Sequence, residues 1–281
     1  MPLRDLLRSA RPRQWIKNIL LIAPSLTSGV LPEPRPAARL VVAFVAFSLT
    51  ASGVYFINDV RDADHDREHP TKRLRPVAAR ALTPRLAIAV GALLVATGLL
   101  LGLSIRLGSV IGVYAAVSLA YCFLLRNLVV TDLLAVASGF PLRVIAGGQA
   151  TGATVSFWLL VTTCAGSLFV VTGKRYSEAV VFGAAKVRIR PSLSRYRVVH
   201  LRLAWLCSVA VAMTAYAIWA FGEGNAFSAM SLIPFALALL RYMEAINGAR
   251  AAYPEDLVQK DRTLQALGMT WLGIFAARGF A

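Results

Sequence analysis

Charge is scarce in this chain of 281 residues. Only 16% of its residues are charged, whereas soluble domains carry about 25%. Hydrophobic residues make up 57% of the chain, and the mean hydropathy is +0.63. Such a composition leaves no room for a sizeable soluble domain. It predicts an all-α polytopic membrane protein in which residues 1–281 form a single membrane-embedded domain.

Cysteine is also rare, and its placement excludes two kinds of site. Cys122, Cys164 and Cys207 all lie inside apolar runs, without paired spacing and without neighbouring ligand residues. Cysteines in such surroundings are usually small buried hydrophobes, so neither a disulfide framework nor a zinc site is expected. The three histidines lie in or beside basic loops, where we expect them to be solvated and not catalytic.

Apolar runs of about the length needed to cross a bilayer fill most of the chain. The nine predicted spans lie near residues 15–31, 38–57, 83–105, 108–125, 131–149, 155–173, 199–221, 227–246 and 262–279. The N-terminus lacks a short apolar core followed by a cleavage site, so no removable signal peptide is expected.

Basic residues outnumber acidic ones by 30 to 14, and both are distributed unevenly between the loops. With the N-terminus in the cytoplasm, 25 of the 30 Lys and Arg residues fall on the cytoplasmic side and four on the other. This asymmetry predicts that orientation in the plasma membrane. We interpret the excess of bases as orientation signals and contacts with membrane lipids, and we expect no nucleic-acid partner. Twelve of the 14 acids share the cytoplasmic side, where we expect the active site.

One segment concentrates the acids. NDVRDADHDREHPTKRLRP, residues 58–76, follows the second span and holds four aspartates within eight residues. Asn58, Asp62 and Asp66 recur every four residues, so they share one face of a helix, with Asp59 beside them. Carboxylates on one face repel each other unless a cation lies between them. Oxygen ligands suit Mg²⁺, which typically takes one or two carboxylates plus substrate phosphates. These four residues are the predicted metal ligands; a solvated acidic loop is the alternative.

This spacing after the second span resembles the first aspartate-rich motif of the UbiA superfamily of intramembrane prenyltransferases. RPRQWIKN, residues 11–18, is similar to the segment that precedes the first span in that superfamily. The resemblance implies a UbiA-like bundle of nine helices whose active site opens to the cytoplasm. It also implies that the motif binds Mg²⁺ and the diphosphate of a substrate.

The chain departs from the superfamily after the sixth span, where most members carry a second aspartate-rich motif. Here GKRYSE, residues 173–178, offers one acid and two bases. Together with LRVIAGG at 142–148, IPFALALLRY at 233–242 and PEDLVQKDR at 254–262, it resembles a phosphoribosyltransferase branch. That resemblance implies phosphoribosyl pyrophosphate as donor, a polyprenyl phosphate such as decaprenyl phosphate as acceptor, and homo-oligomers. The product would be a precursor of cell-wall arabinan.

The implied reaction is displacement at ribose C1 by an already anionic lipid phosphate, so no strong general base is needed. Positioning and electrostatic stabilisation would supply the catalysis. The candidate catalytic residues are Asp62, Asp66, Lys174 and Tyr176. The candidate substrate-binding residues are Lys17, Asn18, Lys72, Arg73, Arg75, Tyr121, Arg126, Arg143, Lys174, Arg175, Tyr176 and Glu178.

Position along the chain suggests which phosphate each group would meet. Lys17 and Asn18 begin the first span, at the depth of a lipid phosphate. Arg143 lies within a span, where a charge costs at least about 2.5–3.5 kcal/mol and normally faces a cavity or a partner. The bases at 174–175 are expected to bind donor phosphates. The bases at 72–75 are expected to reach the pyrophosphate or the 5-phosphate, or else to act only as orientation signals.

Three other functions account for less of the sequence. A purely structural membrane anchor leaves the four aspartates of residues 58–66 unexplained. An ordinary prenyltransferase of the same fold would move an isoprenyl group from its diphosphate to an aromatic or quinone precursor, and GKRYSE argues against it. A transporter would carry ionisable residues deep in several spans, whereas here only Arg143 lies well inside one.

Overall fold

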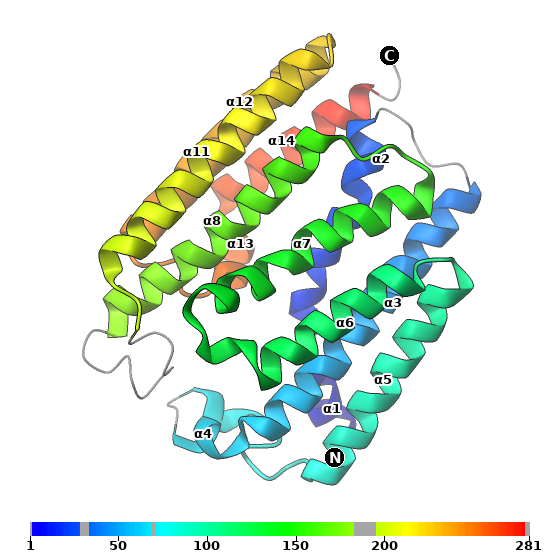
Figure 1. Cartoon of the computed structure of the whole chain (residues 1–281), viewed down its shortest axis with the longest axis vertical. Coiled ribbons are helices and arrows are strands. Elements are labelled where there is room, and N and C mark those ends of the chain that lie inside the picture. The colour runs from blue at the N-terminus through cyan, green and yellow to red at the C-terminus, as the bar shows by residue number, and fades with distance from the viewer. Residues whose placement is uncertain (1, 29–33, 69–70, 183–194, 279–281) are drawn as a thin grey trace.

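The computed structural model describes residues 2–28, 34–68, 71–182 and 195–278, and these form helices and connecting turns without a strand. Figure 1 shows the helices packed as an elongated bundle. Six described helices are long and apolar enough to cross a membrane, and Gly108–Phe123 is a shorter apolar helix. Each of these seven coincides with a predicted span. The described parts of the predicted first and ninth spans fall on helical segments that do not meet both criteria, and residues 29–31 and 279 of these spans lie outside the described residues.

The elements of the first half of the described chain are α1 (Pro2–Ala10), η1 (Pro12–Ile22), α2 (Ala23–Thr27), α3 (Pro34–Arg61), α4 (Ala63–Glu68), η2 (Lys72–Leu74), α5 (Pro84–Ser104), α6 (Gly108–Phe123), η3 (Leu125–Asn127) and α7 (Val129–Thr151). Those of the second half are α8 (Phe157–Phe182), α11 (Val198–Gly222), α12 (Ala226–Asn247), α13 (Pro254–Lys260) and α14 (Arg262–Arg278).

The first predicted span differs from the expectation of one regular helix. Residues Pro12–Ile22 form a 3₁₀-helix, which changes to the α-helix α2 at Ala23. Pro24 explains the place of the change, because proline lacks an N–H and is best accommodated in the first turn of an α-helix. At this junction the Ala23 N–H still donates to the carbonyl of Leu20, three residues back, which is the 3₁₀ pattern.

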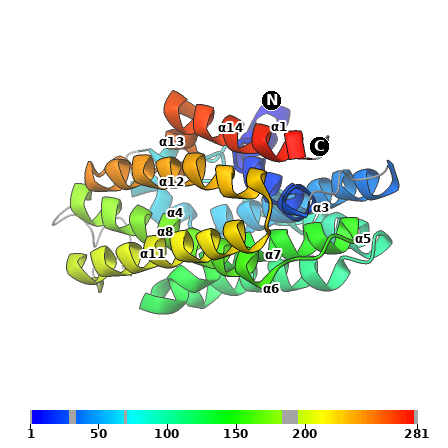
Figure 2. The ribbon, with the colours of Figure 1, turned by 90° about the horizontal axis from the view of Figure 1, so that it is seen from above.

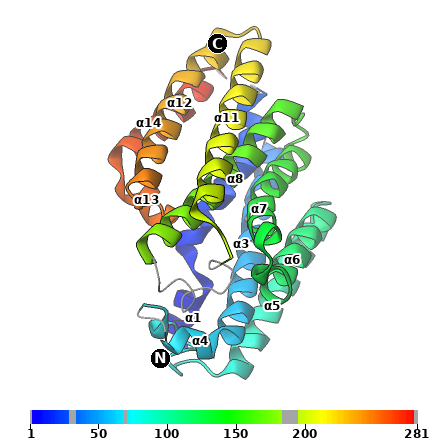
Figure 3. The same cartoon turned by 60° about the vertical axis from the view of Figure 1, so that its left-hand side comes forward.

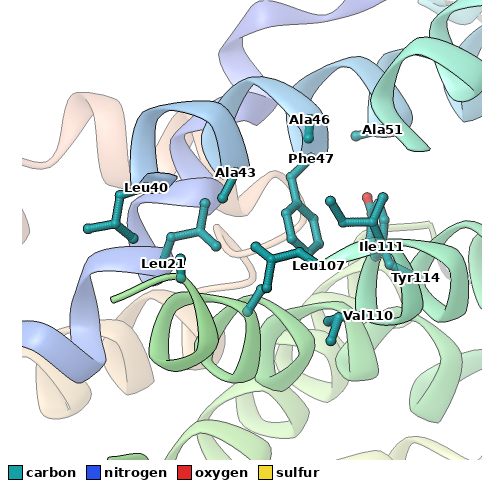
Figure 4. Packing of buried hydrophobic residues seen from close by; sticks show 12 residues of the cluster. Leu21, Leu40, Ala43, Ala46, Phe47, Ala51, Leu107, Val110, Ile111 and Tyr114 are labelled. Carbon is teal, nitrogen blue, oxygen red and sulfur yellow. The ribbon is translucent and has the colours of Figure 1, made fainter. Parts of the chain in front are cut away.

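A glycine of α7 lets this helix approach η1 closely. A Cβ added to Gly147 of α7 would lie 2.0 Å from the Leu21 carbonyl oxygen of η1. Leu21 joins Phe47 of α3 and Ile111 and Tyr114 of α6 in a buried cluster, which Figure 4 shows from close by. In a bilayer, where helix association depends on packing and not on exclusion of water, such close contacts hold the bundle together. They fix η1 against α3 and α7.

The helices divide into two groups with η1 and α2 between them. Figures 1 and 2 show α3, α5, α6 and α7 on one side and α8, α11, α12 and α14 on the other. The element α2 contacts both α7 and α14. Figure 3 shows α1 and α4 at the end of the bundle opposite the turn between α11 and α12. The end that holds α4, η3 and α13 also carries most of the charged side chains described below.

Candidate functional site

The acidic stripe is helical. Asp62 N–H donates to the Asn58 carbonyl at 2.9 Å, and Asp66 N–H donates to the Asp62 carbonyl at 2.8 Å. These bonds carry the helical register of α3 across into α4, so Asn58, Asp62 and Asp66 lie one above another. The Asn58 amide nitrogen donates to Asp62 Oδ2 at 3.2 Å. Asp64 lies off this stripe, with its side chain 95% exposed.

Three arginines from outside α3 and α4 pair with the acids at the end of α3 and in α4. Arg126 of η3 pairs with Asp62. Arg75 donates to Asp66 Oδ2 at 2.7 Å and to Asp59 Oδ1 at 3.2 Å. Arg11, which precedes η1, also pairs with Asp59. The three arginine side chains keep roughly a quarter of their surface exposed. The acids are therefore neutralised by cations that remain accessible from the surface.

The donor chemistry of the stripe fits a magnesium ion. Asn58, Asp62 and Asp66 offer hard oxygen atoms on one helical face, and the Asp62 side chain is 17% exposed. Among the described residues no three His, Cys, Asp or Glu side chains are gathered around a common metal position. Magnesium is usually held by one or two carboxylates and completed by substrate phosphates and water. Asp59 is 2% exposed, below the stripe and between two arginines.

The end of α8 carries a second polar cluster, which is much more deeply buried. Arg175 pairs with Asp132 of α7 through two parallel contacts, Nε to Oδ2 at 3.0 Å and Nη2 to Oδ1 at 3.2 Å. Its remaining nitrogen donates to Glu178 Oε2 at 3.0 Å. The Arg175 and Asp132 side chains are 3% and 0% exposed. A bidentate pair of this kind fixes both side chains in one geometry. Tyr121 of α6 lies near enough to Arg175 to interact with it electrostatically.

A third cluster joins the beginning of the chain to its end. Lys17 Nζ of η1 lies 2.7 Å from Glu255 Oε1 of α13, and Lys17 also donates to Gln14 at 2.6 Å. Lys174 of α8 is the second cation that acts on Glu255. Burial raises the pKa of the Glu255 carboxyl, but the two ammonium groups outweigh it and lower the pKa to about 2. Glu255 is therefore ionised at neutral pH.

The segment RPRQWIKN is bonded to α3 along its length. Besides Arg11 with Asp59, Trp15 Nε1 donates to Ser52 Oγ at 3.1 Å, and Asn18 Nδ2 donates to Ser48 Oγ at 2.9 Å. The Lys17 side chain pairs instead with Glu255 of α13. These contacts place Lys17 and the acidic stripe on one rigid frame.

Arg143 lies inside the bundle below Lys17. Its Nε donates to Asn18 Oδ1 at 2.6 Å, Nη1 to the Gly139 carbonyl at 2.5 Å, and Nη2 to the Tyr114 hydroxyl at 3.2 Å. The guanidinium also stacks over the Tyr114 ring, 4.8 Å from its centroid. Arg143 is 5% exposed and Asn18 1% exposed. The Arg143 guanidinium, predicted to lie within a span, is therefore surrounded by polar groups of the protein.

The remaining predicted residues lie at the edge of the site. Lys72 is half-buried, Arg73 is exposed at the surface in η2, and Tyr176 packs against the apolar cluster that contains Trp205. Several participants were missed from the sequence, among them Arg11, Ser48, Asp132 and Glu255. Asp132 carried a usable signal, because an acid at the start of an apolar span needs a partner. Arg11 and Glu255 stand in RPRQWIKN and PEDLVQKDR, but spacing alone does not reveal a partner from a distant segment.

A helical bundle with six helices long and apolar enough to cross a membrane among the described residues defines an integral membrane protein, and the acidic stripe with its paired cations lies at one end of it. The model of the UbiA prenyltransferase family matches residues 20–259, and the chain belongs to this family. The fold agrees with that of a UbiA homologue from Archaeoglobus fulgidus bound to GPP and Mg²⁺, with a TM-score of 0.76 at 18% identity and 98% of each chain covered.

Relatives of known name are more similar in sequence. The decaprenyl-phosphate phosphoribosyltransferase of Mycolicibacterium smegmatis is 41% identical over 290 residues, covering 97% of this chain and 91% of that protein. The protein of the same name from Corynebacterium glutamicum is 37% identical over 281 residues, covering 95% of this chain and 84% of that protein.

Proposed function

We propose that this protein transfers the 5-phosphoribosyl group of phosphoribosyl pyrophosphate to a polyprenyl phosphate, releasing pyrophosphate. The observation that carries the proposal is the 41% identity, over nearly the whole chain, to a protein named decaprenyl-phosphate phosphoribosyltransferase. The charged residues support it, because the end of α8 supplies two cations where a second diphosphate-binding acid motif would stand. The product, decaprenylphosphoryl-5-phosphoribose for a decaprenyl acceptor, would feed cell-wall arabinan synthesis.

The arrangement in the membrane is part of the proposal. Besides the six long apolar helices, α6, the η1–α2 segment and α14 would complete nine crossings. The end with α4, η3 and α13 would face the cytoplasm, because the predicted orientation places most Lys and Arg residues there. A water-soluble anionic donor would then reach the acidic stripe directly.

Asn58, Asp62 and Asp66 would hold Mg²⁺ from the helical stripe. When bound, the ion supplies charge neutralisation to the departing pyrophosphate. Asp59 would stay between Arg11 and Arg75 as their counter-ion, since it is buried and already paired with both. Arg75 and Arg126, each about a quarter exposed, are the side chains that would turn from carboxylates to phosphates. Because Asp62 is also partly exposed, its pair with Arg126 is only weakly stabilising.

The acceptor phosphate would lie near Lys17, whose side chain is 28% exposed. Asn18 and Arg143, buried beneath it, would hold η1 in place.

An oxygen of the lipid phosphate forms a bond to ribose C1 while the bond from C1 to the pyrophosphate oxygen breaks. The electron pair leaves with pyrophosphate. No proton has to be removed from the attacking oxygen, so positioning and charge stabilisation supply the catalysis. Tyr176 and Glu178 are the candidates to orient the ribose, Lys174 to bind phosphate, and Arg175 to hold Glu178 in place.

A transfer assay in membranes tests the proposal. Radiolabelled phosphoribosyl pyrophosphate, polyprenyl phosphate and Mg²⁺ are supplied to membranes that carry wild type, Asp62→Asn or Asp64→Asn. Label should enter an organic-extractable lipid with wild type and with Asp64→Asn, whose side chain is off the stripe. Asp62→Asn should lose about 100-fold, since several kcal/mol of charge stabilisation depends on the metal. Reaction of a polyprenyl diphosphate with an aromatic acid, without label transfer, would instead assign a prenyltransferase.

A further inference from the structure

Lys17 and Glu255 lie near opposite ends of the sequence but form an ion pair in the folded chain. Lys17 belongs to η1 and Glu255 to the first turn of α13, and Nζ and Oε1 lie 2.7 Å apart. Lys174, half-buried at the end of α8, acts on the same carboxylate. An ionised carboxylate therefore lies within the influence of two ammonium groups from separate segments. One lysine in direct contact with a carboxylate, and a second within electrostatic range of it, is an arrangement that suits a phosphate ligand.

The position of α13 does not depend on Glu255. Leu257 packs onto the apolar cluster that contains Tyr242 and Ile246 of α12. At the other end of α13, Asp261 accepts from Arg241 Nε at 3.0 Å and from the Thr263 and Leu264 N–H groups. The face of α13 that bears Asp256 and Lys260 lines a cleft of about 510 Å³. Since other contacts hold the helix, Glu255 is available for a different role.

We propose that Lys17 and Lys174 form one binding site for a phosphate monoester, and that the Glu255 carboxylate occupies the place of that phosphate until the ligand arrives. A phosphate monoester dianion carries more charge and more acceptor oxygens than a carboxylate, so it displaces Glu255 from the lysines. Glu255 is thus a positioning residue that pairs with Lys17 and, together with Glu178, offsets the charge of Lys174. The inference rests on the proposed function, which supplies two such phosphates.

The two sources are the polyprenyl phosphate headgroup and the 5-phosphate of the ribosyl donor. Lys17 stands among exposed apolar side chains of η1, since Ile16 and Ile19 are 45% and 49% exposed. Such a surface faces lipid in a membrane protein, so the lipid headgroup is the favoured ligand. Both sources share the chemistry of the proposed site, and the probes separate them.

Binding to the full chain in detergent, without turnover, tests the inference. Farnesyl phosphate and ribose 5-phosphate are titrated separately into wild type, Glu255→Gln and Asp256→Asn. Asp256 is the matched control, because it is adjacent in sequence and 47% exposed, and its partner Lys260 is 3.8 Å away. We expect Glu255→Gln to bind farnesyl phosphate about fivefold more tightly, the effect of removing one partly exposed ion pair. Asp256→Asn should bind like wild type. A gain confined to ribose 5-phosphate would assign the site to the donor.

Lysine variants supply the second measurement. Lys17→Gln and Lys174→Gln should each weaken binding of whichever probe Glu255→Gln strengthens, because both ammonium groups contact the same anion. Unchanged or weaker binding of both probes to folded Glu255→Gln would overturn the inference, as would lysine variants that affect different probes. These results are independent of catalysis. A chain that fails to transfer phosphoribose yet shows the binding pattern refutes only the proposed function.

Discussion

The ends of α3 and α8 carry opposite arrangements of charge. At the end of α3 the helix and its continuation supply the acids, and arginines from three other segments pair with them. At the end of α8 the helix supplies Lys174 and Arg175, and the acids come from α7 and α13 as well as from Glu178. One helix end therefore carries carboxylates paired with arginines from elsewhere, and the other carries cations paired with acids from elsewhere.

The two ends also differ in burial. In the Asp62–Arg126 pair the side chains are 17% and 28% exposed, whereas in the Asp132–Arg175 pair they are 0% and 3% exposed. Exposed pairs contribute about 0–1 kcal/mol and exchange partners readily. Removing one member of a buried pair leaves an uncompensated charge and costs about 3–5 kcal/mol. We infer that the pair at the stripe can rearrange around a ligand and that the pair at α8 is structural.

Breaking the buried pair should have the largest effect. Asp132→Asn removes the carboxylate that binds two nitrogens of Arg175 and should reduce the free energy of unfolding by about 3–5 kcal/mol. Tryptophan fluorescence during denaturant unfolding in detergent measures the loss. Asp64→Asn is the control, since its side chain is 95% exposed. An unfolding midpoint equal to that of the control would show that the buried pair does not stabilise the fold.

Breaking the exposed pair should affect substrate binding more than folding. Arg126→Gln removes a cation that we expect to turn from Asp62 to a donor phosphate. The KM for phosphoribosyl pyrophosphate should rise about tenfold, the lower end of the loss for a charge-assisted hydrogen bond. The thermal midpoint should stay close to that of Arg67→Gln, a matched arginine that pairs with exposed Asp64. A large fall in the midpoint with unchanged KM would assign Arg126 a purely structural role.

The smallest effect concerns pH and the Lys17–Glu255 pair. The pKa of Glu255 is about 2 in the folded protein against an ordinary value of 4.5. A depressed carboxyl pKa adds stability that is fully present above the unfolded value and is lost as the pH falls toward the folded value. Wild type and Glu255→Gln should thus differ by a constant amount, about 1 kcal/mol at most, between about pH 5 and 7. The difference should shrink below about pH 4.5, as unfolding at a series of pH values would reveal. A step near neutral pH would contradict this assignment.

Hydropathy located the long helices well. The predicted spans at 199–221 and 227–246 correspond to Val198–Gly222 and Ala226–Asn247. The 3₁₀ geometry of Pro12–Ile22 was not predicted, because hydropathy reports which segments are apolar and not which backbone hydrogen bonds they form. The roles of the individual site residues remain predictions.

The sequence by itself determined that the acids lie on one helical face and that charge gathers at one end of the bundle. Both follow from short-range rules: the 3.6-residue helical period places Asn58, Asp62 and Asp66 in register, and burying charge in a bilayer is costly. Only the tertiary structure decided the partners. It joined Arg175 to Asp132 and Lys17 to Glu255. Electrostatic pairing depends on distance in space, and the spacing of residues along the chain does not contain the packing that brings α7 to α8 and α13 to η1.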